Sequence, residues 1–215
     1  MRLTALRYGA TLLSEAQIFL GGRKERMYPI SLTIYLIETE GRRILVYAGC
    51  DTMPGFPLTE MAGPVAVLRE MGYAPEDITD VILTHSHHDH AEGAVHFPHA
   101  LFTVQTEEYP KCERYLPTGA RVRLFGEELT VCENVVVRRV GGHTAGSSVV
   151  ELHQGETVYV LCGDECYSPL CLTRGIPTGA SRCPEKSRAF IETYRHPPYR
   201  VLVAHDPVNV SERVF

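Results

Sequence analysis

The chain has 215 residues, 44% of them apolar and 22% charged, a balance that is typical of a globular protein and excludes a disordered or coiled-coil chain. Its net charge of -5 would repel phosphate backbones, so we expect no nucleic-acid partner. No apolar run approaches the roughly 20 residues that cross a bilayer, and residues 1–7 favour a strand over a signal peptide. We therefore expect a cytoplasmic protein with a single domain over residues 1–215 and no membrane partner.

Short apolar runs rich in β-branched residues predict most of the regular structure. In chain order, strands are expected over residues 34–37, 44–46, 81–83, 101–104, 135–137, 148–150, 158–161 and 201–203. The dipeptide Glu40-Gly41 predicts a hairpin turn after the first of these strands, and the Pro- and Gly-rich stretch 53–57 predicts a loop.

Two helices are expected beside these strands. One has Pro64 in its first turn and ends at Gly72. The other begins at Pro184 and carries Phe190, Ile191 and Tyr194 on one face. Because strands dominate and helices are interspersed, we predict an α+β protein in which two packed sheets have helices on the outside.

The seven cysteines form no C-x-x-C pair, and an odd number without an export signal indicates reduced thiols. Four of them lie between residues 162 and 183, so a thiolate metal site there stays open as an alternative. Packing as small apolar side chains is the preferred interpretation, also for Cys166.

Histidine is the unusual residue, with ten in the chain. Directly after the predicted strand 81–83 stands the run T-H-S-H-H-D-H. Imidazole suits borderline metals such as zinc, and a carboxylate adds a charged ligand. If the run is a loop that opens a helical turn, His85 and His87 can face one metal ion while Asp89 and His90 face a second. A polar loop that is rich in histidine by chance is the alternative.

Neither ion would be complete with these four side chains, and the later sequence offers three more. His143 lies in the Gly-rich stretch 141–147, where glycines relieve backbone crowding. Asp164 follows the strand 158–161, and its two oxygens could bridge two ions. His205 follows the last predicted strand. Strand ends at a common sheet edge would bring these residues together.

Taken together, these motifs resemble the metallo-β-lactamase superfamily: T-H-x-H-x-D-H at 84–90, G-H-T-x-G-S at 142–147, Gly-Asp at 163–164 and then His205, in the same order. The resemblance implies that family's four-layer αβ/βα sandwich and two divalent metal ions. It implies one ion bound by His85, His87 and His143, a second bound by Asp89, His90 and His205, and a bridging Asp164. Zinc is the default for these ligands, with iron, manganese and cobalt as alternatives.

Two metal ions about 3.5–4 Å apart can hold a bridging hydroxide that attacks an acyl carbon. Asp89 is then expected to shuttle the proton. Tyr167, three residues after Asp164, is similar to the N-acyl homoserine lactonase branch, in which this phenol hydrogen-bonds the substrate carbonyl or the developing oxyanion. A packing tyrosine at the rim is the alternative. Aspartate at 164, where true zinc β-lactamases of the main class carry cysteine, argues against antibiotic hydrolysis.

One position departs from the family pattern. Tyr47 stands where the family carries an aspartate that supports the metal site, and Asp51 is the candidate substitute. Because such supporting carboxylates typically change metal affinity or activity by 10–100-fold, we predict weak metal retention and a gain from Tyr47→Asp.

The leading prediction is therefore a dinuclear metal-dependent hydrolase that opens a lactone, such as an acyl homoserine lactone, with Asp89 and Tyr167 as its catalytic residues. The alternatives are another small-molecule ester, thioester or phosphodiester hydrolase on the same fold, and a metal-binding protein with little activity. The expected partner is a small-molecule substrate. The oligomeric state cannot be read from the sequence, and a homodimer is one option.

Overall fold

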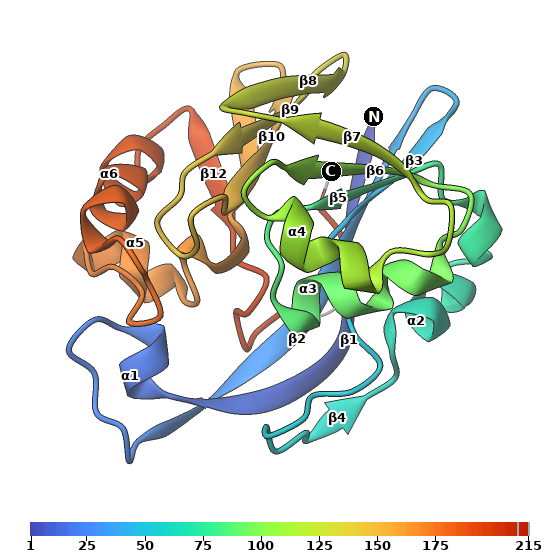
Figure 1. The fold of residues 1–215 in the computed structure, drawn as a ribbon. Helices are drawn as coiled ribbons and strands as arrows, with labels where there is room; N and C mark the ends of the chain where they lie inside the picture. Colours follow the sequence, from blue (N-terminus) through green and yellow to red (C-terminus); the bar gives the residue numbers. More distant parts are fainter. Residues whose placement is uncertain (210, 215) are drawn as a thin grey trace.

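Two β-sheets pack against each other in the computed structural model, which describes residues 1–209 and 211–214 (Figure 1). The first sheet has the order β13 (Glu212–Arg213), β1 (Arg2–Ser14), β2 (Met27–Thr39), β3 (Arg42–Val46), β5 (Asp80–Leu83), β6 (Leu101–Gln105) and β7 (Arg121–Phe125), with β4 (Glu60–Met61) paired to β1. The second has the order β12 (Tyr199–Leu202), β11 (Thr157–Leu161), β10 (Ser148–Gln154), β9 (Val135–Arg139) and β8 (Glu128–Cys132).

Short helices lie outside the sheets. The α-helices are α1 (Glu15–Ile18), α2 (Pro64–Glu70), α3 (His88–Ala91), α4 (Tyr109–Cys112), α5 (Pro169–Arg174) and α6 (Pro184–Tyr194). Four 3-10 turns are η1 (Pro75–Asp77), η2 (Glu92–His96), η3 (Glu113–Tyr115) and η4 (Gly163–Glu165). In Figure 1, α5 and α6 lie beside the second sheet, whereas α2, α3 and α4 lie on the side of the first. The predicted two-sheet sandwich with outer helices is confirmed.

The late helix α6 shows how the sequence builds this arrangement. Proline in the first turn needs no backbone donor there, so Pro184 can open the helix. Phe190, Ile191 and Tyr194 are buried as predicted, in one cluster with Val149 and Val160 of the second sheet. Burial of this apolar face holds the helix on the sheet.

Strands β1 and β2 are much longer than the sequence indicated. Each has 13 residues, and they pair antiparallel from Arg2↔Glu38 to Ser14↔Met27, with a register shift between Arg7 and Gly9. The predicted strand 34–37 is only the last part of β2. Cross-strand pairing stabilises residues 8–14 of β1 and residues 27–33 of β2, which lack a local strand pattern.

The strands that precede the metal-ligand candidates end at one edge of the sandwich. Strand β5 is wholly buried between its parallel neighbours β3 and β6. Strands β11 and β12 are also parallel, with Leu161 opposite Leu202, so their following loops emerge together. The Ser148 N–H donates to the Thr84 carbonyl at 3.0 Å and joins the two sheets at this edge.

All seven cysteines are free, and Cys162, Cys166 and Cys171 are buried. Among the described residues, the groups of side chains close enough to share a metal ion contain no cysteine, so the alternative thiolate site is wrong. Throughout the described part of the chain, every helix is too short or too polar to span a membrane.

Candidate metal centre

The seven side chains singled out in the sequence converge at the loop edge described above. His85 and His87 lie in the loop after β5, Asp89 and His90 in α3, His143 between β9 and β10, Asp164 in η4, and His205 after β12. They form two neighbouring groups of potential metal ligands, and within each group the ligand atoms lie within 4.8 Å of one another.

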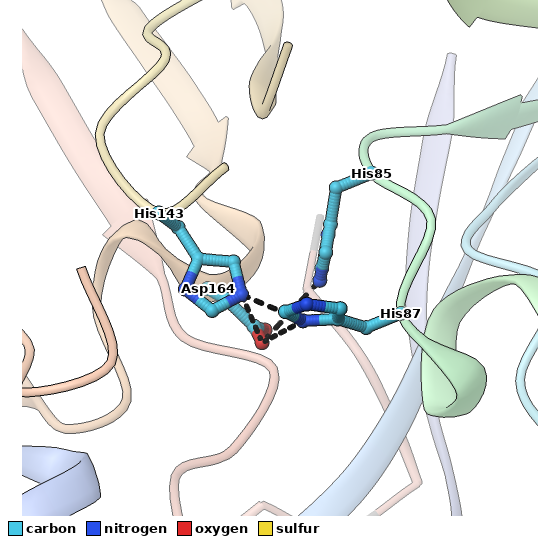
Figure 2. A group of neighbouring side chains, drawn as sticks. All are labelled: His85, His87, His143 and Asp164. Carbon is cyan, nitrogen blue, oxygen red and sulfur yellow. Dashed lines mark hydrogen bonds and ion pairs between the residues drawn. The ribbon is translucent and has the colours of Figure 1, made fainter. Parts of the chain in front are cut away.

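The first group consists of His85, His87, His143 and Asp164 (Figure 2). Asp164 Oδ2 lies 3.4 Å from His85 Nε2, 3.2 Å from His143 Nε2 and 4.0 Å from His87 Nδ1. His143 Nε2 and His87 Nδ1 are 2.8 Å apart. Figure 2 shows the three rings pointing toward the same carboxylate from two loops, one that carries His85 and His87 and one that carries His143.

The second group consists of Asp89, His90 and His205. Asp89 Oδ2 is 3.6 Å from the Nε2 atoms of both histidines. The other oxygen of Asp164, Oδ1, lies 2.8 Å from His90 Nε2 and 3.0 Å from His205 Nε2. Asp164 therefore faces each group with a different carboxylate oxygen.

The surroundings of these histidines shift their pKa values in opposite directions, and cation binding to a protonated imidazole would release its proton. Burial lowers the pKa of His85 to about 3, so this imidazole is neutral. Burial also lowers the pKa of His205, but the neighbouring Asp164 outweighs it and raises that pKa to about 9. Since His205 Nδ1 lies 2.9 Å from the Ser31 carbonyl, a proton on Nδ1 would direct the Nε2 lone pair toward the centre.

An unpaired polar atom also indicates a cation site. His85 Nε2 is buried and has no hydrogen-bond partner among the described residues, although it faces Asp164. An orphaned buried nitrogen is costly, and a divalent cation between imidazole and carboxylate would satisfy it. The His/Asp set therefore fits a site for divalent metal ions.

Two buried glutamates that sequence analysis missed hold the ligand loops. Glu108 accepts hydrogen bonds from the Ser86 N–H and hydroxyl at 3.0 and 2.7 Å, and from the Thr144 hydroxyl and Gly146 N–H at 2.7 and 3.0 Å. It thus ties the loop of His85 and His87 to that of His143. Burial raises the pKa of Glu108, but these hydrogen bonds outweigh it and leave the pKa lowered.

Glu165 holds the same loop from its other side. It accepts from the N–H groups of Gly142 and His143 at 3.1 and 3.0 Å and from the Ser147 hydroxyl at 2.5 Å. Burial raises its pKa. A Cβ at Gly142 would collide with Glu165, and one at Gly146 would collide with Gln105, so both glycines are required for close approach. Its position directly after Asp164 was the sequence feature that could have indicated a role for Glu165 at the site.

Tyr47 does not leave its position empty. Its hydroxyl accepts a 2.7 Å hydrogen bond from the Gly163 N–H, one residue before Asp164, and its ring packs edge-on against His90 at 4.6 Å. Tyr47 is 1% exposed and has a left-handed φ of 64°. Asp51 as its substitute is wrong, because the Asp51 carboxylate lies 2.6 Å from His96 Nε2 instead.

A cavity of about 610 Å³ opens beside the first group and is lined in part by His87, His143, Asp164 and Tyr167. The Tyr167 hydroxyl donates to Asp164 Oδ2 at 2.5 Å, and its ring stacks on His205 at 4.9 Å. His88 lines the cavity as well, and its Nε2 lies 2.8 Å from the Thr52 carbonyl. The cavity can thus accept a small molecule next to the metal-ligand candidates.

Comparison with known proteins gives a family match. The family model described as Metallo-beta-lactamase superfamily matches residues 28–205. The N-acyl homoserine lactonase AiiB of Agrobacterium fabrum is 27% identical over 109 residues, which cover 44% of this chain and 40% of that protein. A hydroxyacylglutathione hydrolase of Salmonella paratyphi A is 30% identical over 150 residues, 66% of this chain and 51% of that protein. The matches thus span about half or less of these relatives.

A solved structure has the same fold. An N-acyl homoserine lactone hydrolase with N-hexanoyl-L-homoserine bound at its catalytic metal centre superposes with a TM-score of 0.83, covering 95% of this chain and 93% of that one. The two sequences are 22% identical, so the likeness establishes the αβ/βα sandwich and leaves the substrate to be argued from the site.

Proposed function

Because the chain belongs to the metallo-beta-lactamase superfamily, whose fold it shares with solved hydrolases, we propose that it is a dinuclear metal-dependent hydrolase that opens the ring of a lactone of the acyl homoserine lactone type. The observation that carries the dinuclear proposal is the position of Asp164, whose Oδ2 faces one ligand group and whose Oδ1 faces the other. A carboxylate shared in this way is suited to bridging two cations.

In this proposal His85, His87 and His143 hold one ion, and Asp89, His90 and His205 hold the second, with Asp164 common to both. We propose zinc, because imidazole and carboxylate are ligands that it accepts. Bound divalent ions would supply Lewis acidity toward a carbonyl oxygen and lower the pKa of a coordinated water.

The protein contributes a hydrogen-bond donor and a proton carrier. Burial, with Asp164 nearby, raises the pKa of Tyr167 well above its ordinary value, so the phenol keeps its proton. A substrate carbonyl oxygen in the cavity could accept a hydrogen bond from this phenol, which would stabilise the negative charge that develops on the oxygen. Asp89 lies at the cavity wall and would carry the proton to the leaving alkoxide as the ester bond breaks.

The test uses the metal-loaded chain and a panel of lactones, thioesters, phosphodiesters and β-lactams. We expect lactone hydrolysis, and Tyr167→Phe should lower kcat for the lactone by about 10²–10³, as for other lost oxyanion donors, with unchanged metal content. Tyr194→Phe is the matched control, because Tyr194 is also buried and its hydroxyl also donates to a carboxylate, that of Glu151, but it lies outside the cavity lining. Turnover of the thioester or phosphodiester alone would refute the lactone assignment.

A thioester hydrolase is the second candidate, favoured by the likeness to the hydroxyacylglutathione hydrolase of Salmonella paratyphi A. It predicts thioester turnover that is indifferent to Tyr167→Phe. Two tightly held ions without turnover of any panel substrate would instead favour a metal-binding protein with little activity.

A further inference from the structure

The cavity wall carries positive charge that the proposed lactone hydrolysis does not use. Apart from the candidate metal ligands and His88, its charged lining residues within the described part of the chain are Arg114 and Arg182. The chain as a whole has more acidic than basic residues, 26 against 21. The two arginines in the cavity wall therefore give it a local positive charge that is opposite in sign to the net charge of the chain.

Arg182 is attached to the loop of His143. Its backbone N–H lies 2.9 Å from the Gly142 carbonyl and 3.3 Å from the His143 carbonyl. The side chain is exposed and has no hydrogen-bond or ion-pair partner in residues 1–209 and 211–214. Elsewhere, by contrast, arginines such as Arg42 pair with carboxylates. The Arg182 guanidinium is therefore available to a ligand.

Arg114 lies in the turn η3. Its guanidinium lies over the Tyr115 ring, 4.6 Å from the centroid, and donates to the Tyr115 hydroxyl at 2.8 Å. The Tyr115 ring in turn contacts His88 at 6.0 Å. Stacking orients the planar guanidinium and leaves its other N–H donors without a carboxylate partner among the described residues. Arg114 thus belongs to a turn that contacts the histidine loop through Tyr115 and His88, and Arg182 belongs to a segment that is hydrogen-bonded to the loop of His143.

The remaining wall is mainly apolar, and Leu13, Ile30, Met53 and Phe56 contribute to it. Asp89 and Asp164 already face imidazoles, so they do not neutralise the arginines. A ligand that is complementary to this cavity has an apolar body, which contacts the apolar wall, and an anionic group, which pairs with the arginines.

We propose that the substrate is an anionic ester or lactone, in which a carboxylate or phosphate remote from the reacting carbonyl is bound by Arg114 and Arg182. This inference rests on the proposed hydrolase function and narrows its substrate class. Hydrolysis breaks the acyl C–O bond with one water and yields an alcohol and a second acid group, so the product of a carboxylate-bearing lactone is a dianion at neutral pH.

The test compares γ-lactones of equal length whose side chains end in a carboxylate, a phosphate or a neutral carboxamide. For the wild type we expect kcat/KM at least about tenfold higher for one of the anionic substrates, since hydrogen bonds to charged groups are the stronger ones. The better of the two anions identifies the group. The preference should shrink with added salt, because the arginines are exposed.

Arg114→Gln and Arg182→Gln should each lower kcat/KM for the anionic substrate about tenfold and leave the carboxamide substrate unchanged. Arg188→Gln, on the exposed face of α6 and outside the cavity lining, is the matched control and should change neither. Equal wild-type rates for charged and neutral substrates, or an equal loss for both in the variants, would overturn the proposal.

Binding separates this proposal from the proposed function. The corresponding γ-lactams, which resist hydrolysis, are titrated into the wild type and both variants by calorimetry. If no lactone is hydrolysed but the anionic lactams bind in an arginine-dependent manner, the anion site stands and the lactonase proposal fails. If charged and neutral lactams bind alike, the anion site fails whatever the activity.

Discussion

Replacing Tyr47 by phenylalanine removes the hydroxyl that holds the backbone next to Asp164, the proposed bridging ligand. The Gly163 N–H would lose its 2.7 Å acceptor at a buried position, where solvent has no ready access to replace it. An unsatisfied buried donor costs about 1–3 kcal/mol, which corresponds to roughly five- to 150-fold in an equilibrium constant. Because Gly163 directly precedes Asp164, we expect part of this cost to appear as weaker metal binding.

The assay is competition with a chelator of known affinity, read as the metal dissociation constant, together with urea unfolding of the metal-free protein. Tyr47→Phe should weaken metal binding about tenfold to hundredfold, the range for residues that orient metal ligands. Tyr35→Phe is the matched control, because Tyr35 is equally buried and packs edge-on against Tyr47 at 5.9 Å, but makes no hydrogen bond to η4 in the described residues.

A purely structural role predicts a different pattern. The metal-free protein would then be destabilised while the metal dissociation constant stayed at the wild-type value. That result, or an equal loss of metal affinity in both phenylalanine variants, would refute the reasoning. The family pattern predicts a gain from Tyr47→Asp, and this stays a prediction. Against it, an aspartate side chain is shorter than tyrosine and would give up the hydrogen bond that the Tyr47 hydroxyl accepts from the Gly163 N–H.

Three further outcomes are expected. Glu108→Gln should destabilise the protein by about 3 kcal/mol in urea unfolding, because the amide nitrogen cannot accept from the donors that one carboxylate oxygen now satisfies; the exposed neighbour change Glu107→Gln should cost little. Since the folded pKa of Glu108 lies below the unfolded value of about 4.5, its stabilisation is present above that pH and is lost as pH falls through the folded pKa, so the variant should show a weaker acid-side decline than the wild type. Asp164→Asn should reduce bound zinc from two ions per chain to at most one by elemental analysis, because an amide has only one oxygen; two ions in the variant would contradict the bridging proposal.

Much of the candidate site was predictable because most of its metal-ligand candidates lie in short local sequence motifs. The run at residues 84–90 follows a strand that its apolar residues identify, and the Gly-rich loop and Gly-Asp pair stand out in the same way. The helix α6 and its buried face were likewise predictable from periodicity. The full length of β1 and β2 was not, because pairing between the two strands stabilises residues without a local strand pattern.

The sequence by itself determined which imidazoles and carboxylates are available, and in what order, since side-chain chemistry belongs to each residue. Only the tertiary structure decided which oxygen of Asp164 faces which histidines, that Glu108 joins two ligand loops, and that the Tyr47 hydroxyl meets Gly163. These contacts join residues up to 116 positions apart. Their distances are set by the packing of two sheets and the loops at their shared edge, which no local pattern of residues encodes.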